Sequence, residues 1–354
     1  MTDWDLTQPL QQVAQLAAKH GLSQVTITDS LTLSWLLGIR DGVREGVSDP
    51  AFAVRVTAQG EQPVVRVVAP VNEVDQVRDL LSREVIQAAS IEFEAVPWQQ
   101  WPVSAEMDAA FGSDLVTLRR TMLPQHLARL ESLTGDVTAI VEQALLAVDR
   151  GVPERELAGV LARALHRRGI QPQVLLIGSG DRFAHIKHPF PSDARLDGEV
   201  MVSVGARRHG VVTSVTRIAA FNALRADQRD LFECLLRVEG AFLDASADGV
   251  ALAEVFDRGT RAYTTHGLGE NAWHAHHQGG LAGLAAREVI AGKGESLQLA
   301  SGMVVAWNPS HAGFKAEDIA IVGPGGATPL GGPGSGWPAH LHHGRVRPGI
   351  LEKG

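Results

Sequence analysis

The spacing of apolar residues alternates between helical and strand-like periods along the first hundred residues. Apolar positions recur every three or four residues over 8–19, which predicts a helix that ends before Gly21. Two valine-rich runs, 51–57 and 63–69, flank the polar sequence AQGEQP and predict a β-hairpin. A further helix and strand are predicted at 71–84 and 90–96.

Periodicity is weak in the segment that follows residue 97. Pro97, Pro102 and Gly112 interrupt any regular spacing, so the sequence predicts a linker near 112–122 between two domains. The length of 354 residues agrees with two domains, at roughly 150 residues per domain.

Two amphipathic helices are predicted in the second part of the chain. The segment 151–169 ends in a glycine and places four apolar residues on one helical face: Leu157, Val160, Leu161 and Leu165. The second helix shows similar spacing at Leu231, Leu235, Val238 and Phe242.

Strand-like runs lie between and after these helices, at 173–178, 199–207, 211–221, 302–307 and 318–322. The second and third runs are joined by RRHG, which suits a hairpin and is too short for the crossover that parallel strands need. The sequence therefore predicts an α+β domain with a curved antiparallel sheet, rather than a doubly wound parallel sheet. The Gly/Pro-rich end of the chain is expected to be irregular.

Composition and charge exclude several classes of protein. Apolar residues make up 45% and charged residues 20% of the chain, as in ordinary globular domains. Lys and Arg number 32 against 40 Asp and Glu, and the net charge of −8 gives no electrostatic basis for binding nucleic acid or a membrane. The N-terminus lacks the apolar core of a signal peptide, and no run of about 18 apolar residues occurs. We therefore expect a cytoplasmic protein.

Several common catalytic signatures are missing from the sequence. No glycine-rich segment has the Lys-Ser/Thr of a phosphate-binding loop, and Ser179 fails the GxSxG pattern because position 177 is isoleucine. The single Cys234 excludes an intrachain disulfide, and its apolar helix face suggests a buried structural thiol. The HLHH sequence at 340–343 offers metal ligands, but on a flexible tail it is interpreted as a solvated cluster.

Four motifs follow one another through the second part of the chain: the helix 151–169, VSVGARRHGVVTSVTR (202–217), HHQGGLAGLAARE (276–288) and GMVVAWNPSHAGFKAED (302–318). Their order and spacing resemble the pita-bread metallopeptidase family, which includes prolidase, aminopeptidase P, methionine aminopeptidase and creatinase. The earlier SLTLSWLLGIRDG (30–42) resembles the entry to the N-terminal domain of the prolidase and creatinase branch.

This resemblance implies a division of the chain and an assembly. It implies a creatinase-type α/β domain over 1–115, a pita-bread domain over 116–330 and a Gly/Pro-rich tail over 331–354. It also implies a homodimer, because prolidase-branch relatives commonly place the small domain of one chain over the pocket of the partner.

The resemblance also locates the metal ligands of the family, which are two Asp, one His and two Glu. The two Asp positions hold Ser203 and Ser214, the His position holds Gly280, and the first Glu position holds Asn308. Only Glu317 matches. Because one carboxylate among neutral groups cannot balance two divalent cations, we expect neither a bound metal nor another cofactor.

Creatinase is the metal-free member of the family and uses a histidine as a proton shuttle. His188 occupies the matching place in HPFPSD, and Arg287 stands where creatinase also has an arginine. Creatinase has another arginine at the position of Gly280, so its substrate contacts do not transfer as a set.

The expected pocket combines groups for proton transfer with groups for binding. The predicted catalytic residues are His188, His276, His277 and Glu317. The predicted substrate-binding residues are Ser203, Ser214, Arg217, Gln278, Arg287, Trp307 and Asn308. The alternatives are that Arg217 braces the sheet through an ion pair, that Arg287 belongs to a surface turn, and that His276 and His277 only form structural hydrogen bonds.

Two functions from different classes fit this pocket. One is a metal-independent, creatinase-like hydrolase of a small amide or guanidino compound with a carboxylate, in which His188 transfers protons and Glu317 orients it. The other is an inactive pita-bread protein that binds a short peptide or small ligand. A residual Xaa-Pro aminopeptidase would need metal ligands that the chain mostly lacks.

Overall fold

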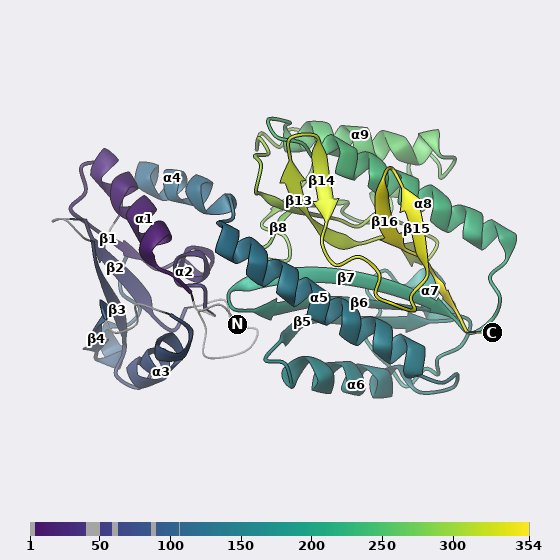
Figure 1. The fold of residues 1–354 in the computed structure, drawn as a ribbon, viewed down its shortest axis with the longest axis horizontal. Helices are drawn as coiled ribbons and strands as arrows, with labels where there is room; N and C mark the ends of the chain where they lie inside the picture. The colour runs from purple at the N-terminus through teal and green to yellow at the C-terminus, as the bar shows by residue number, and fades with distance from the viewer. Residues whose placement is uncertain (1–3, 40–49, 59–62, 86–89, 106, 354) are drawn as a thin grey trace. The chain divides into compact units, whose positions relative to one another are not determined.

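The computed structural model describes residues 4–39, 50–58, 63–85, 90–105 and 107–353 (Figure 1). The chain divides into two compact units, of which the first comprises Met1–His126 with Arg208–Val211 and the second comprises Leu127–Arg207 with Val212–Gly354. The division falls inside helix α5 (Pro124–Ala147). No helix in the described part of the chain has the length and apolar character needed to cross a membrane.

The first unit contains a four-stranded sheet with helices. The sheet has the order β1 (Gln24–Ile27), β2 (Ala53–Thr57), β3 (Val64–Pro70) and β4 (Glu92–Val96), and only the last pair is parallel. The accompanying helices are α1 (Thr7–Lys19), α2 (Ser30–Leu37), α3 (Val74–Glu84) and the short η2 (Trp98–Gln100). The predicted hairpin and both predicted helices are confirmed. Residues 59–62 in the turn of the hairpin, and residues 40–42 of the motif SLTLSWLLGIRDG, lie outside the described residues.

The linker predicted near 112–122 is wrong, because most of this segment is helix α4 (Ala109–Arg120). Asp108 caps the helix by accepting a hydrogen bond of 2.6 Å from the backbone N–H of Phe111. Phe111 and Leu115, one turn apart, are buried on its inner face. The helical spacing was therefore present in the sequence, but the preceding prolines concealed it.

The second unit is built on a nine-stranded, largely antiparallel sheet, as the sequence predicts. The strands run in the order β5 (Gln171–Ser179), β6 (Glu199–Arg208), β7 (Val211–Ala220), β13 (Asp318–Gly323), β10 (Val304–Trp307), β8 (Gly279–Ala282) and β9 (Val289–Ile290). Strand β14 (Gly326–Pro329) adds to β13, and β17 (Leu351–Glu352) adds to β7 in parallel. The sheet is curved, as the sequence analysis expected (Figure 1).

Helices cover this sheet beside both of its halves (Figure 1). Helices α5 and α6 (Glu154–His166) lie near β5, β6 and β7, whereas α8 (Ala226–Ala245) and α9 (Leu252–Thr265) lie near β13, β10 and β8. The short helix α7 (Asp181–His185) precedes the loop that carries His188, and η3 (Ala272–Ala275) precedes the segment that carries His276. Helix α6 buries Leu157, Leu161 and Leu165 as predicted, but Val160 is 54% exposed and faces away from the core.

The C-terminal segment was expected to be irregular, but it forms further strands. Strands β15 (Ala339–His342) and β16 (Arg345–Pro348) form a hairpin, and the chain then enters β17 in the main sheet. Glycines made this segment look unstructured, but they occupy its turns, as at Gly344 with a φ of 73°. A second hairpin, with strands of two residues each, borders the site described below. Its strands are β11 (Ser310–His311) and β12 (Phe314–Lys315).

A chain of five buried charges links the sheet to two helices. Arg217 on β7 donates to Glu142 of α5 at 2.7 Å and to Asp318 of β13 at 2.9 Å. Arg347 on β16 forms an ion pair with the other oxygen of Asp318 at 2.9 Å and donates to both oxygens of Glu239 on α8. Because each arginine is at most 2% exposed, solvent contributes little to balancing these charges.

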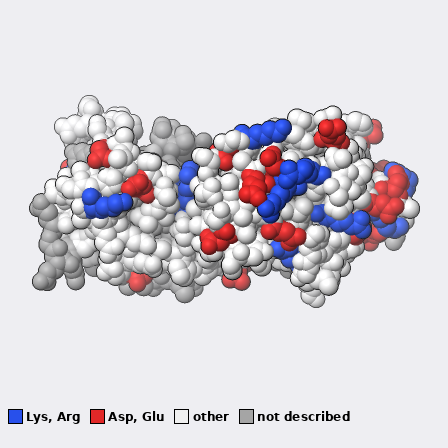
Figure 2. Space-filling model, turned by 90° about the horizontal axis from the view of Figure 1, so that it is seen from above, with Lys and Arg blue, Asp and Glu red and all other residues white. Residues whose placement is uncertain are grey.

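The surface carries both signs of charge. Figure 2 shows Lys and Arg interspersed with Asp and Glu over the visible face, without one sign dominating it.

Removing one arginine from the buried network should destabilise the second unit strongly. We expect Arg347→Met to lower the free energy of unfolding by about 3–5 kcal/mol, because Glu239 loses its partner inside the protein. Arg229→Met is the control, since Arg229 pairs with Glu352 at the surface, where water screens the pair and its loss should change stability little. Urea denaturation of both variants measures the difference. Equal shifts in the two variants would contradict a structural role for the network.

Candidate functional site

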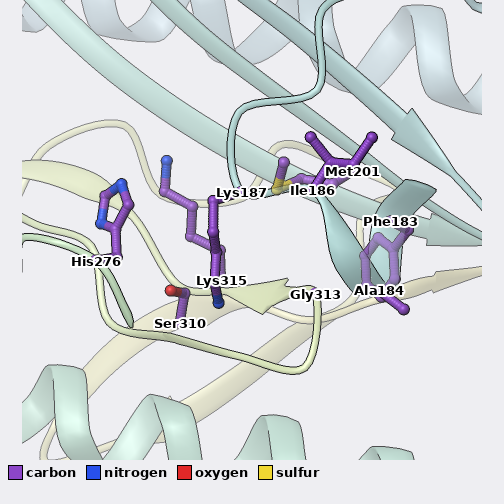
Figure 3. A pocket seen from close by; sticks show the side chains of 9 residues that line it. All are labelled: Phe183, Ala184, Ile186, Lys187, Met201, His276, Ser310, Gly313 and Lys315. Carbon is purple, nitrogen blue, oxygen red and sulfur yellow. The ribbon is translucent and has the colours of Figure 1, made fainter. Parts of the chain in front are cut away.

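A pocket of the second unit has a polar end and an apolar end (Figure 3). His276, Ser310, Lys187 and Lys315 provide its polar groups. The apolar end is lined by Phe183 and Ala184 of α7, by Ile186 and by Met201 of β6. A ligand that fits this lining would carry an apolar group and an anionic or hydrogen-bond-accepting group.

His188 and His276 meet at this site, as the sequence analysis expected, although 88 residues separate them. Their Nε2 atoms are 2.9 Å apart, so one of the two must carry a proton. The Nδ1 atom of His276 lies 2.5 Å from the backbone oxygen of His277, which only accepts hydrogen bonds, so this Nδ1 carries the proton.

This arrangement determines the tautomer of both rings. A neutral His276 with its proton on Nδ1 presents a lone pair at Nε2, so the Nε2–H of His188 donates to it. The Nδ1 atom of a neutral His188 then carries a lone pair that is available to accept a proton. The geometry therefore gives His188 the atom that a general base requires.

The environment keeps the two neighbouring histidines neutral. Burial, helped by the positive charges nearby, lowers the pKa of His276 to about 3. Partial burial and the guanidinium of Arg287 lower the pKa of His277 to about 4. Near neutral pH both rings are therefore hydrogen-bonding groups without charge.

Glu317 lies at the centre of the polar network beside this pocket. Its carboxylate accepts hydrogen bonds from Thr216 at 2.7 Å and from Ser203 at 3.3 Å. It also pairs with Arg287 at 2.9 Å and with Lys315 at 2.5 Å. Its side chain is only 5% exposed, so these partners replace water around the charge.

The two cations decide the protonation of Glu317. Burial alone would raise the pKa of this carboxyl, but Lys315 and Arg287 hold it well below its usual range. A carboxylate that stays ionised in this way is a poor proton acceptor. Glu317 therefore positions cations and hydroxyl groups, rather than taking protons itself.

Lys315 and Lys187 are polar groups of the site that the sequence analysis missed. Lys315 donates to Ser203 at 3.1 Å as well as pairing with Glu317. The FKAED spacing was an available signal, because residues two apart in an extended segment lie on the same face. Within the described residues, no carboxylate lies within ion-pairing distance of Lys187, and burial lowers the pKa of its ammonium group.

Arg217 and Trp307 are placed in the packed interior rather than at the pocket. Arg217 is enclosed by Glu142, Asp318 and two backbone carbonyls, which is the sheet-bracing ion pair that the sequence analysis kept as an alternative. The ring of Trp307 stacks on Phe242 at a centroid distance of 4.5 Å. Neither side chain is available to a ligand, so we do not expect either to bind a substrate.

Gln278 and Asn308 are also buried, but they lie next to the histidines. Gln278 accepts a hydrogen bond from Tyr263 at 2.8 Å and donates to the backbone oxygen of His276 at 2.7 Å. Its backbone oxygen accepts the N–H of Asn308 at 3.0 Å. Gln278 therefore positions the segment that carries His276. Ser214, on β7, is buried as well.

The lowered pKa of His276 has a measurable consequence. An unfolded histidine titrates near about 6.5, so below that pH the unfolded chain binds a proton that the native His276 does not bind. Stability should therefore decrease as the pH falls from about 6.5 towards 3. NMR of ¹⁵N-labelled histidine should show His276 neutral at pH 5, with the proton on Nδ1. His276→Gln assigns the signal, and a midpoint near 6.5 would contradict the lowered pKa of the half-buried His276.

Comparison with solved structures shows the fold. The dipeptidase PepE from Mycobacterium ulcerans matches with a TM-score of 0.71 and 19% identity, over 98% of each chain. The prolidase from Pyrococcus horikoshii OT3 matches with a TM-score of 0.72 and 16% identity, over 92% of this chain and 99% of its own. The Xaa-Pro dipeptidase from Bacillus anthracis gives 0.69 and 16%, over 92% and 97%.

No curated protein matches the sequence. A family model does match, over residues 133–334, which is more than half of the chain. These residues include all four motifs through which the sequence resembles the pita-bread enzymes. The chain therefore belongs to the metallopeptidase family M24.

Proposed function

We propose that this protein is a metal-independent hydrolase of a small amide or short peptide that carries a carboxylate. The observation that carries the proposal is the hydrogen bond between His188 and His276, which leaves an open proton acceptor on His188 beside a cationic pocket. A family member without the usual ligands would then work through its own histidines and ammonium groups.

The donor set does not fit the two metals that the family implies. The five ligand positions given by the resemblance hold two hydroxyl groups, one glycine, one amide and one carboxylate: Ser203, Ser214, Gly280, Asn308 and Glu317. The only carboxylate is already neutralised by Lys315 and Arg287. Gly280 offers no side-chain ligand, and the carboxylate of Glu317 is paired with two cations. These positions therefore carry too little negative charge for two divalent ions.

The side chains present suggest how hydrolysis would proceed. The Nδ1 atom of His188 takes a proton from water as the water oxygen bonds to the amide carbon. The Nε2–H of His188 remains bonded to His276, which holds the ring in one orientation. His188 then returns the proton to the amine as the C–N bond breaks, so that the ring is neutral again.

The charges of the pocket favour an acidic amide over a guanidino compound. Lys187 and Lys315 line the pocket, and a positively charged guanidinium would be repelled by both. A carboxylate would be attracted, and the partly exposed Ile186 offers an apolar contact beside it. We therefore assign to Lys187 the carboxylate-binding role that the sequence suggested for Arg217 or Arg287.

Activity should not depend on divalent metal. We expect hydrolysis to continue in the presence of a chelator and to gain nothing from added manganese, cobalt or zinc. Elemental analysis should find no ion that is lost specifically in Glu317→Gln, since the charge of Glu317 is balanced by protein cations. About two ions per wild-type chain that disappear in this variant would contradict the proposal.

Replacing the proposed base should abolish most of the activity. His188→Ala should reduce turnover by about 10²–10⁴, the range for one positioned acid–base group. His185→Ala is the control, because this exposed histidine lies three residues away on α7 and its ring is hydrogen-bonded to the backbone oxygen of Asp181 in its own turn. The assay is a screen of N-acyl amino acids, dipeptides and guanidino acids. Equal turnover in both variants would remove His188 from the reaction, and wild type that binds these compounds without turnover would indicate the binding protein instead.

A further inference from the structure

A second cluster of potential ligand groups lies in the second unit, outside the pocket. His340 and His342 are on β15, and Glu233 is on α8. The Nδ1 atom of His340 is 3.0 Å from one oxygen of Glu233, and the Nε2 atom of His342 is 2.9 Å from the other. Within the described residues, this is the one group of three His, Cys, Asp or Glu side chains whose ligand atoms all lie within 4.8 Å of one another.

The hairpin geometry explains why the two histidines converge. Side chains two apart on a strand point to the same face, so His340 and His342 both face α8 while Leu341 between them is 74% exposed. Strand β16 fixes the register, because it pairs His340 with Arg347 and His342 with Arg345.

The same two arginines hold the hairpin on α8. Arg347 is paired with Glu239, and Arg345 is paired with Asp244, both on that helix. The ring of His340 lies close against Gly349, where an added Cβ would come within 2.5 Å of its Nε2 atom. The missing side chain at Gly349 therefore leaves space for a ring whose Nδ1 atom faces Glu233.

We propose that Glu233, His340 and His342 bind one divalent ion of the zinc class. Zinc binds imidazole nitrogen and carboxylate oxygen at about 2.0–2.2 Å, so two ligand atoms of a tetrahedral site are about 3.3–3.5 Å apart. The observed separations of 3.0 and 2.9 Å, each to a different oxygen of Glu233, are a few tenths of an ångström shorter, and the three ligand atoms all lie within 4.8 Å of one another. Three protein ligands leave a fourth position for water.

The donor types select the class of metal. Two imidazoles suit zinc, nickel or copper, whereas magnesium and calcium prefer oxygen ligands throughout. Arg237 adds a positive charge close to His342, so the site should bind more weakly than an isolated set of the same ligands.

The ion would fasten the C-terminal hairpin to α8. Its ligands come from two elements that are distant in the sequence, and its charge would be balanced only in part by Glu233. The cluster shares no residue with the pocket that contains His276 and Lys315. The proposal is therefore independent of the hydrolase proposed above and of the ligand positions of the family.

The experiment is a zinc titration of the full chain after removal of metal with a chelator. Competition with a chromophoric chelator should give one site per wild-type chain, and magnesium should not compete. His340→Ala and His342→Ala should each weaken zinc binding by at least about 10–100-fold, the loss that second-shell changes already produce. Glu233→Gln should also weaken it.

His343→Ala is the matched control. It removes a histidine from the same HLHH sequence, but His343 pairs with Asp244 instead of joining the cluster. Zinc should raise the melting temperature of wild type and of His343→Ala, but not that of His342→Ala. Circular dichroism of the metal-free variants verifies that each is folded. The proposal would be overturned by a zinc affinity that is unchanged in His340→Ala and His342→Ala. It would also be overturned if wild type bound no zinc at about 10⁻⁴ M, a concentration well above typical dissociation constants of zinc sites.

Discussion

Asp318 lies between two buried arginines, and the second unit depends on this arrangement. Strands β7 and β13 share only one registered pair, Asp318 with Val215, at the centre of a nine-stranded sheet. Few backbone hydrogen bonds therefore join the two halves. The carboxylate of Asp318 compensates by pairing with Arg217 on one side and with Arg347 on the other, and these in turn hold α5 and α8. Burial makes each partner necessary, because a single unpaired charge there would be far more costly than the pair.

The same constraint fixes the pocket. Glu317 immediately precedes Asp318, the first residue of β13, and the two carboxylates face different cations, because Asp318 pairs with Arg217 and Arg347 while Glu317 pairs with Lys315 and Arg287. Thr216 and Arg217 are related in the same way on β7, because Arg217 joins the buried network while Thr216 donates to Glu317. Charge in the pocket is then balanced locally by Lys315 and Arg287. The buried arginine network and the polar cluster around Glu317 thus lie on opposite sides of β7.

The sequence predicts much of this protein, and the exceptions have physical causes. The order of the motifs predicted the sheet and its hairpin 199–221, because their spacing follows a known arrangement. The same arrangement placed His188 and His276 in one expected pocket, although 88 residues separate them. The partners of Arg217 were not predictable from spacing, since Glu142 and Asp318 lie 75 and 101 residues away from it in sequence. Lys315 was not predicted, because the family motif identifies positions of anionic ligands and not the cation that pairs with Glu317. Helix α4 was hidden by prolines that precede its cap, and the C-terminal hairpin by glycines that form its turns.

The buried network around Asp318 and the residues of the proposed site are separate sets. In a metal-dependent relative, clustered carboxylates at the ligand positions would repel one another unless cations were bound, so metal and fold would be coupled there. In this chain Ser203, Ser214 and Asn308 carry no charge, and the remaining Glu317 is balanced by protein cations. The polar cluster is therefore electrostatically satisfied without a metal, while the network around Asp318 holds the sheet. Family membership consequently establishes how the chain folds, but the reaction must be argued from the side chains that line the pocket.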